Sequence, residues 1–221
     1  MSQSSILIWI FSLTVACVFQ STLTSARFVS VEELKADIKS RDIDRIDKSL
    51  NEVKRMSYQG QVLPLMLDLW EVKKENHPDL PWDIITSEIV RVEVANVLIQ
   101  ASINGKIDLD RKALHQYVSG LVANRDIAVA ARAIGTLAVT DDPRDVPKIL
   151  AIAKSMRQGI FHTAVITLTN MCNEDAAKAV EDLGVHVTEK ELHSFVIETK
   201  KTAEAFKKKT GRCKQNRGLP H

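Results

Sequence analysis

The sequence has few aromatic residues and no sustained alternation of apolar and polar residues. Phe, Trp and Tyr make up 5% of its 221 residues, and Leu, Ile, Val and Ala supply most of the 45% that is hydrophobic. Sheets of β-sandwiches and barrels favour alternating strands that are rich in β-branched and aromatic residues. Because both features are lacking, the composition argues against an all-β fold and favours helices packed on helices.

The sequence also lacks the short motifs that mark common catalytic sites. It contains no H-E-x-x-H, no G-x-S-x-G and no phosphate-binding loop. The best remaining candidates for a metal site are His186, Glu189 and His193, because Glu189 and His193 would share one helix face. A solvated helix start with incidental imidazoles explains the same residues and is preferred. We therefore expect no cofactor and no catalytic set, and an enzyme is the less favoured interpretation.

The N-terminal 26 residues differ from the rest of the chain. An uncharged, mostly apolar run from Ile6 to Phe19 precedes small and polar residues that end in Thr24-Ser25-Ala26. A membrane span needs about 20 apolar residues, whereas small residues before the cut are typical of a signal peptide. We interpret residues 1–26 as a signal peptide cleaved after Ala26 and predict a secreted or periplasmic protein. The start MSQSS departs from the pattern because it lacks Lys and Arg. The alternatives are an uncleaved membrane anchor and a lipoprotein modified at Cys17.

Cysteine is scarce, with three residues in the whole chain. Removal of Cys17 with the signal peptide would leave Cys172 and Cys213, an even number in an oxidising compartment. A disulfide between them would join the C-terminal segment to the end of a helix. Two unpaired thiols, with Cys172 filling an apolar face, remain the alternative.

The net charge of +2 conceals a basic C-terminal segment. Residues 198–221 hold eight basic residues against two acidic ones, so the rest of the chain is net negative. The basic residues are Lys200, Lys201, Lys207, Lys208, Lys209, Arg212, Lys214 and Arg217. This asymmetry is typical of contact with an acidic protein face or an anionic membrane surface, and a flexible solvated tail explains it equally well. Nucleic acid is disfavoured because the protein is expected to be exported and Phe206 is the segment's single aromatic residue.

From Val29 onward, apolar residues recur at the spacing of an α-helix. Ser30 and Glu33 form the pattern of a capping box. A long helix is expected from Ile84 to Ile103, and Asp110 is expected to begin another that reaches about Val122. The chain is therefore predicted to be all-α, with roughly nine or ten helices joined by short polar turns.

Two stretches in the second half of the chain share one plan. In the first, Ala130, Ala133, Ile134 and Leu137 face one way and are followed by the turn TDDPRD. About 34 residues later, Ala164, Thr167, Leu168 and Met171 occupy the equivalent positions before CNEDAA. A weaker copy places Ala95 35 residues before Ala130. Repetition at this period indicates stacked helical pairs. Ala130, Ala131, Ala133 and Gly135 are expected to let neighbouring helices approach closely, and Asp142-Pro143 is expected to end one helix and start the next.

These residues resemble the HEAT-like and armadillo-type α-helical repeat family. The resemblance rests on Asn124-Arg125-Asp126, on the small-residue core from Ala130 to Leu137 and on Asp142-Pro143. Arg132 lies near, not at, the position where the family usually has its Arg. The resemblance covers residues 110–184 well, extends less clearly over 30–105, and implies an α-solenoid. We therefore divide the chain into a signal peptide at 1–26, a repeat domain at 27–197 and a basic tail at 198–221.

A repeat architecture is nearly silent on activity, because function depends on sites added to the fold. Export, helical repeats and the lack of a catalytic set favour a module or scaffold that binds another protein. An inhibitor or immunity protein for a toxin is a narrower version of that hypothesis. The rivals are a secreted effector or hydrolase with its site in the solenoid groove, and a membrane-surface binder that uses the basic tail.

Overall fold

The described part of the structure is built from helices. A computed structural model describes residues 29–55, 60–156, 159–211 and 213, and these residues contain eleven α-helices, two 3-10 turns and no strand. The expected signal peptide lies outside the described residues. The all-α prediction is confirmed for the part of the chain that is described.

The helices follow one another with short connections. They are α2 (Val31–Lys39), α3 (Ile43–Arg55), α4 (Val62–Glu71), α5 (Trp82–Ile85), α6 (Glu88–Ile103), α7 (Arg111–Leu121), α8 (Ile127–Thr140), α9 (Val146–Lys154), α10 (Phe161–Asn170), α11 (Glu174–His186) and α12 (Lys190–Thr210). The 3-10 turns are η1 (Lys74–Asn76) and η2 (Pro143–Asp145).

Several helix ends form where the sequence predicts them. The Ser30 side chain accepts from the Glu33 backbone N–H at 3.1 Å, and the Glu33 carboxylate accepts from the Ser30 N–H at 3.0 Å, so the capping box is confirmed. Asp110 caps α7 by accepting from the N–H of Lys112. These side chains satisfy backbone donors that have no partner within the helix.

The long helix expected from Ile84 to Ile103 is instead two helices, α5 and α6. The Thr86 hydroxyl donates to the carbonyl of Trp82, and the Ser87 hydroxyl donates to the carbonyl of Ile84. Hydroxyl side chains that bind nearby carbonyls offer the backbone an alternative to a continuous helix. Ser87 then becomes the N-cap of α6, and this break is one reason that the structure has more helices than expected.

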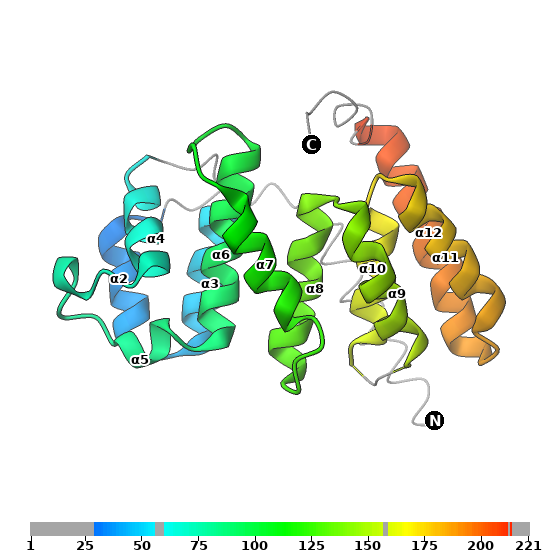
Figure 1. The fold of residues 1–221 in the computed structure, drawn as a ribbon, viewed down its shortest axis with the longest axis horizontal. Helices are drawn as coiled ribbons and strands as arrows, with labels where there is room; N and C mark the ends of the chain where they lie inside the picture. Colours follow the sequence, from blue (N-terminus) through cyan, green and yellow to red (C-terminus); the bar gives the residue numbers. More distant parts are fainter. Residues whose placement is uncertain (1–28, 56–59, 157–158, 212, 214–221) are drawn as a thin grey trace, which may run out of the picture.

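The helices progress along the longest axis of the molecule from α2 at one end to α11 and α12 at the other, although α4 and α5 lie nearer the α2 end than α3 does (Figure 1). Helices α3, α6, α8, α10 and α12 contact one another in succession, and α4, α7, α9 and α11 pack against that row. Each helix therefore packs mainly against helices that are close to it in sequence. Helix α6 lies in the middle of the N-terminal part and is buried on nearly every side.

The core follows the repeated pattern of small and apolar residues. The predicted inward positions of α8 are all buried, as are their counterparts in and just after α10, which confirms the predicted orientation of these helices. Gly135 is an exception, because it is exposed and a Cβ atom there would meet nothing within 4 Å. Ala130 and Ala133 are buried and Ala131 is partly buried, so these small residues lie on the packed side of α8, whereas the expectation for Gly135 was wrong.

The C-terminal helix continues across the boundary expected at residue 197. Helix α12 runs on to Thr210 and ends at Gly211, which adopts a positive φ of 66°. A disulfide joins Cys213 to Cys172, with Cα atoms 5.3 Å apart. The Lys207 ammonium also donates to the carbonyl of Met171. The end of α12 is thus tied to the connection between α10 and α11.

Candidate functional site

The three sequence-predicted metal candidates do not converge in the structure. His186 lies at the end of α11 and contacts Asp182 through Nδ1 at 2.8 Å, while Asp182 also binds Lys154. Glu189 and His193 are exposed at the start of α12, where the contact between them is the backbone bond from His193 N–H to Glu189 carbonyl. Among the described residues, these three do not form a group with its ligand atoms close together.

A different set of residues does converge, at the junction of α7, η2 and α9. His115 Nε2, a carboxylate oxygen of Asp142 and a carboxylate oxygen of Asp145 all lie within 4.8 Å of one another. His115 Nε2 is 2.7 Å from Asp145 Oδ2 and 3.8 Å from Asp142 Oδ2. Because both neighbours of Nε2 are carboxylates, this nitrogen carries the hydrogen and donates it to Asp145.

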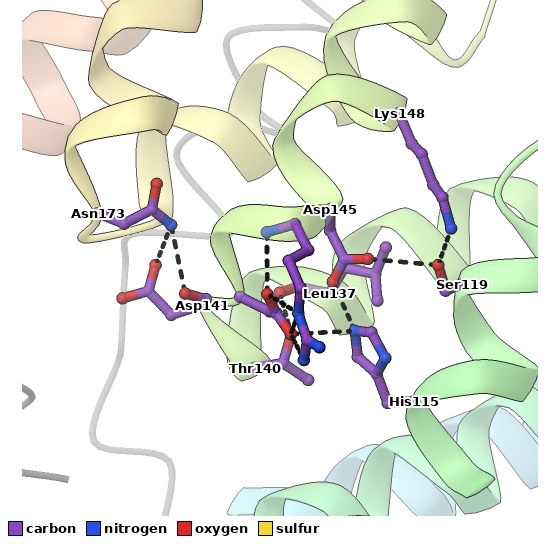
Figure 2. A network of polar contacts seen from close by, with 10 residues as sticks. His115, Ser119, Leu137, Thr140, Asp141, Asp145, Lys148 and Asn173 are labelled. Atoms are coloured by element: carbon purple, nitrogen blue, oxygen red, sulfur yellow. Dashed lines mark hydrogen bonds and ion pairs between the residues drawn. The ribbon is translucent and has the colours of Figure 1, made fainter. Parts of the chain in front are cut away.

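Asp145 is the buried member of the cluster, with a side chain only 2% exposed. Its Oδ1 accepts from the Ser119 hydroxyl at 3.3 Å, and the same hydroxyl accepts from the Lys148 ammonium at 2.7 Å. Figure 2 shows this chain of contacts running from Lys148 through Ser119 and Asp145 to His115. The carboxylate is thus held in one orientation from both sides.

Asp142 is the second carboxylate of the cluster and caps η2. It accepts from the backbone N–H of Arg144 at 2.9 Å, and both its oxygens accept from the Arg144 guanidinium. Hydrogen bonding from Arg144, opposed by burial, lowers the pKa of Asp142 below its usual range. Asp142-Pro143 thus ends the connection from α8 and starts the next helical turn, as predicted.

Asp141 links this turn to the next one. It adopts the left-handed conformation with φ of 52°, and its Oδ1 accepts from the Cys172 backbone N–H at 2.7 Å and from Asn173 Nδ2 at 3.0 Å. Asn173 in turn caps α11 by accepting from the N–H of Ala176. Figure 2 shows Asn173 and Asp141 facing each other on the other side of the turn from His115. The turns TDDPRD and CNEDAA, which the sequence pairs as copies, are therefore in direct contact.

A second polar network joins α3, α6 and α8. Glu93 receives the Lys54 ammonium on Oε2 at 2.6 Å and lies 3.3 Å from Arg132 Nε through Oε1. Arg132 Nε also lies 3.4 Å from Asp47 Oδ1. Asp47, Glu93 and Arg132 border a hollow of about 10 Å³ whose other side is lined by isoleucines, leucine and valine. Ligand pockets usually enclose about 300–1,000 Å³, so this hollow is too small for a typical organic ligand.

A cation and two aromatic rings meet on α4, α6 and α7. The Arg91 guanidinium lies 4.4 Å from the centre of the Trp70 ring and 5.4 Å from that of Tyr117, and the two rings meet edge to face. All three side chains are half-buried. Burial raises the pKa of the Tyr117 hydroxyl. The cluster combines the three residue types that dominate protein-protein hot spots.

The basic residues of the C-terminal segment are divided between the described and undescribed parts of the chain. Lys201, Lys208 and Lys209 are exposed on α12, while Lys200 pairs with Glu181 at 3.2 Å. Lysines in the last turn of a helix are stabilised by the helix dipole, which explains part of the basic run without a partner. Arg212, Lys214 and Arg217 lie outside the described residues.

Sequence patterns did not identify His115, Ser119, Asp145 and Lys148 as a cluster. His115 and Ser119 share a face of α7 at the i, i+4 spacing, and Asp145 and Lys148 follow the TDDP turn. The turn itself was conspicuous, but the packing of α7 beside η2 depends on contacts between segments 26 to 30 residues apart. Such proximity is not visible in local periodicity.

None of the described helices combines the length and the apolar content that a membrane-spanning segment requires. Comparison with family models, with curated proteins and with solved structures finds no match for the chain.

Proposed function

We propose that the chain is an exported protein of HEAT-like helical repeats that binds another protein. The observation that supports this most strongly is the order of helix contacts, in which α3, α6, α8, α10 and α12 contact one another in succession. Arrays of this kind are stabilised by contacts between neighbouring units and present long binding surfaces.

Within this proposal, the half-buried cluster of Trp70, Arg91 and Tyr117 is the anchor of the binding surface. Its side chains come from three helices and hold one another through cation-π and edge-to-face contacts. Rigid aromatic residues lose little conformational freedom when a partner covers them, so they contribute strongly to affinity.

The test uses the exported protein as bait, followed by crosslinking and identification of the captured protein. The purified partner is then titrated against variants. Arg91→Ala should weaken binding by at least about tenfold, as expected at a hot spot. Trp70→Ala should weaken it further, provided that its circular dichroism matches the wild type.

The matched control is the double variant Lys208→Glu and Lys209→Glu, which reverses two exposed charges on α12. Unchanged affinity in this variant with weaker binding of Arg91→Ala supports the cluster as the binding surface. The opposite result assigns binding to the basic segment. If the exported protein captures no partner in its own compartment, the proposed function is wrong.

The narrower form of the proposal is an inhibitor or immunity protein that masks a toxin. It requires that the captured partner harm cells when it is expressed alone and that co-expression of this chain restore growth. A harmless partner would leave the broader binding function and remove the narrower one.

A further inference from the structure

We propose that His115, Asp142 and Asp145 form a binding site for a transition-metal ion of the Zn²⁺ type. This inference is independent of the proposed binding function. The three residues supply one imidazole nitrogen and two carboxylate oxygens, which are established ligands of Zn²⁺. They come from two separate elements that fold against each other, α7 and the turn that begins η2.

The distances between the donor atoms suit a shared ion. Two ligands bound to Zn²⁺ at their usual bond lengths and at a tetrahedral angle lie about 3.3–3.6 Å apart. His115 Nε2 lies 2.7 Å from Asp145 Oδ2 and 3.8 Å from Asp142 Oδ2, values on either side of that range. The third separation, between the carboxylate oxygens of Asp142 and Asp145, is within 4.8 Å, so small side-chain shifts would bring all three donors around one ion.

The charge balance of Asp145 also favours a cation. A buried carboxylate is normally paired with a full positive charge or bound to a metal. Among the described ion pairs, no Lys or Arg nitrogen lies within 4.0 Å of Asp145, because Lys148 binds the Ser119 hydroxyl instead. Arg144 adds a positive charge from farther away, and the carboxylate is contacted directly by the Ser119 hydroxyl and the His115 hydrogen. A metal ion would replace that hydrogen, which leaves to solvent as a proton.

The residues around the three ligands hold them in fixed orientations, as the residues around metal sites generally do. The Ser119 hydroxyl holds the far oxygen of Asp145, and Lys148 holds Ser119, so the ligand is oriented by residues that do not touch the ion. His115 is 23% exposed and Asp142 is 15% exposed. The site therefore has a route to solvent, from which a water molecule would supply the fourth ligand.

Arg144 makes the proposal testable in two directions. Its guanidinium occupies both oxygens of Asp142, but the side chain is 84% exposed. A metal ion must displace Arg144 from at least one oxygen. Removal of Arg144 should therefore strengthen metal binding, whereas removal of a ligand should weaken it. A purely structural network gives no reason for opposite effects from these variants.

The experiment titrates Zn²⁺ into chelator-treated protein by calorimetry, with the absorption spectrum of bound Co²⁺ as a second readout. We expect one ion per chain. His115→Ala and Asp142→Asn should each lower the affinity by at least about tenfold, and Arg144→Ala should raise it by up to about fivefold. The controls His186→Ala and His193→Ala should leave it unchanged. Mg²⁺ should not compete, because it favours oxygen ligands.

Two results would overturn the site. One is the lack of any Zn²⁺ binding by the folded wild-type protein. The other is binding that persists at wild-type affinity in folded His115→Ala. Loss of binding in His186→Ala or His193→Ala alone would move the site to the start of α12.

Discussion

Two of the polar networks among the described residues both join helices, but they do so with different charge patterns. Around Glu93, positive and negative groups alternate from Lys54 to Glu93, Arg132 and Asp47, so each charge lies beside its opposite. At the His115 junction, two carboxylates face one imidazole. The exposed Arg144 pairs with Asp142, and the Lys148 ammonium binds the Ser119 hydroxyl instead of Asp145. Both networks join helices that are distant in sequence. The opposite charges around Glu93 compensate one another, whereas the carboxylates at the His115 junction would be stabilised by an additional cation.

The largest effect is expected when the balanced network loses its central carboxylate. Glu93→Gln leaves Lys54 and Arg132 with little compensation in a site where Lys54 is 12% and Glu93 8% exposed. Loss of one partner of a buried pair costs about 3–5 kcal/mol of the free energy of unfolding. Because Arg132 is partly exposed, the lower end of that range is expected.

Denaturation in urea measures this cost. The matched control is Glu52→Gln, which removes a surface pair with Arg55 and should cost less than about 1 kcal/mol. Similar losses in the two variants would show that the network around Glu93 is no more than an ordinary set of surface charges.

A somewhat smaller change in stability is expected when the network at the His115 junction binds a metal ion. If the site binds Zn²⁺, an ion concentration of 100 times Kd should stabilise the wild-type protein by about 2.7 kcal/mol. The stabilisation should disappear in His115→Ala and persist in Arg132→Lys, which alters the balanced network. Thermal unfolding with and without Zn²⁺ measures both. Stabilisation of equal size in His115→Ala would remove the contrast between the networks.

A substitution in the turn beside the His115 junction should lower the free energy of unfolding by a smaller amount. Asp141→Ala removes the acceptor for Cys172 N–H and Asn173 Nδ2 and also places a Cβ-bearing residue without a local hydrogen bond at positive φ. We expect a loss of about 1–3 kcal/mol. Asp141→Asn keeps an acceptor and tolerates this conformation, so it should lose clearly less. Urea denaturation of both variants tests whether the link between the turns depends on the side-chain acceptor.

The sequence was informative where structure is local. Capping at Ser30 and Asp110, the inward positions of α8 and the turn at Asp142-Pro143 follow from residue type and spacing over a few positions. The break at Ser87 was missed because apolar periodicity continues across it while hydroxyl side chains interrupt the backbone pattern.

The candidate site was harder to predict for a different physical reason. His115 and Asp145 are 30 residues apart, and their contact depends on how α7 packs beside η2. His186, Glu189 and His193 are close in sequence, but they belong to different helices. His186 ends α11, whereas Glu189 and His193 lie at the start of α12. Spacing along one segment thus pointed to the wrong residues, because ligand sets in helical proteins also form between side chains of different helices.

The smallest effect concerns a half-buried histidine that packs against aromatic rings. His162 packs edge to face against Phe161 and Phe195, and burial lowers its pKa. The folded protein therefore binds fewer protons at this site than the unfolded chain does. Its contribution to stability is complete above the unfolded pKa of about 6.5 and declines as the pH falls toward the lower folded pKa. His162→Phe should flatten the stability profile between pH 7.5 and 5.5, as measured by urea denaturation at each pH. Parallel profiles for the two proteins would show that the His162 imidazole gains a proton in the folded state as readily as in the unfolded chain, which would contradict the effect of its burial.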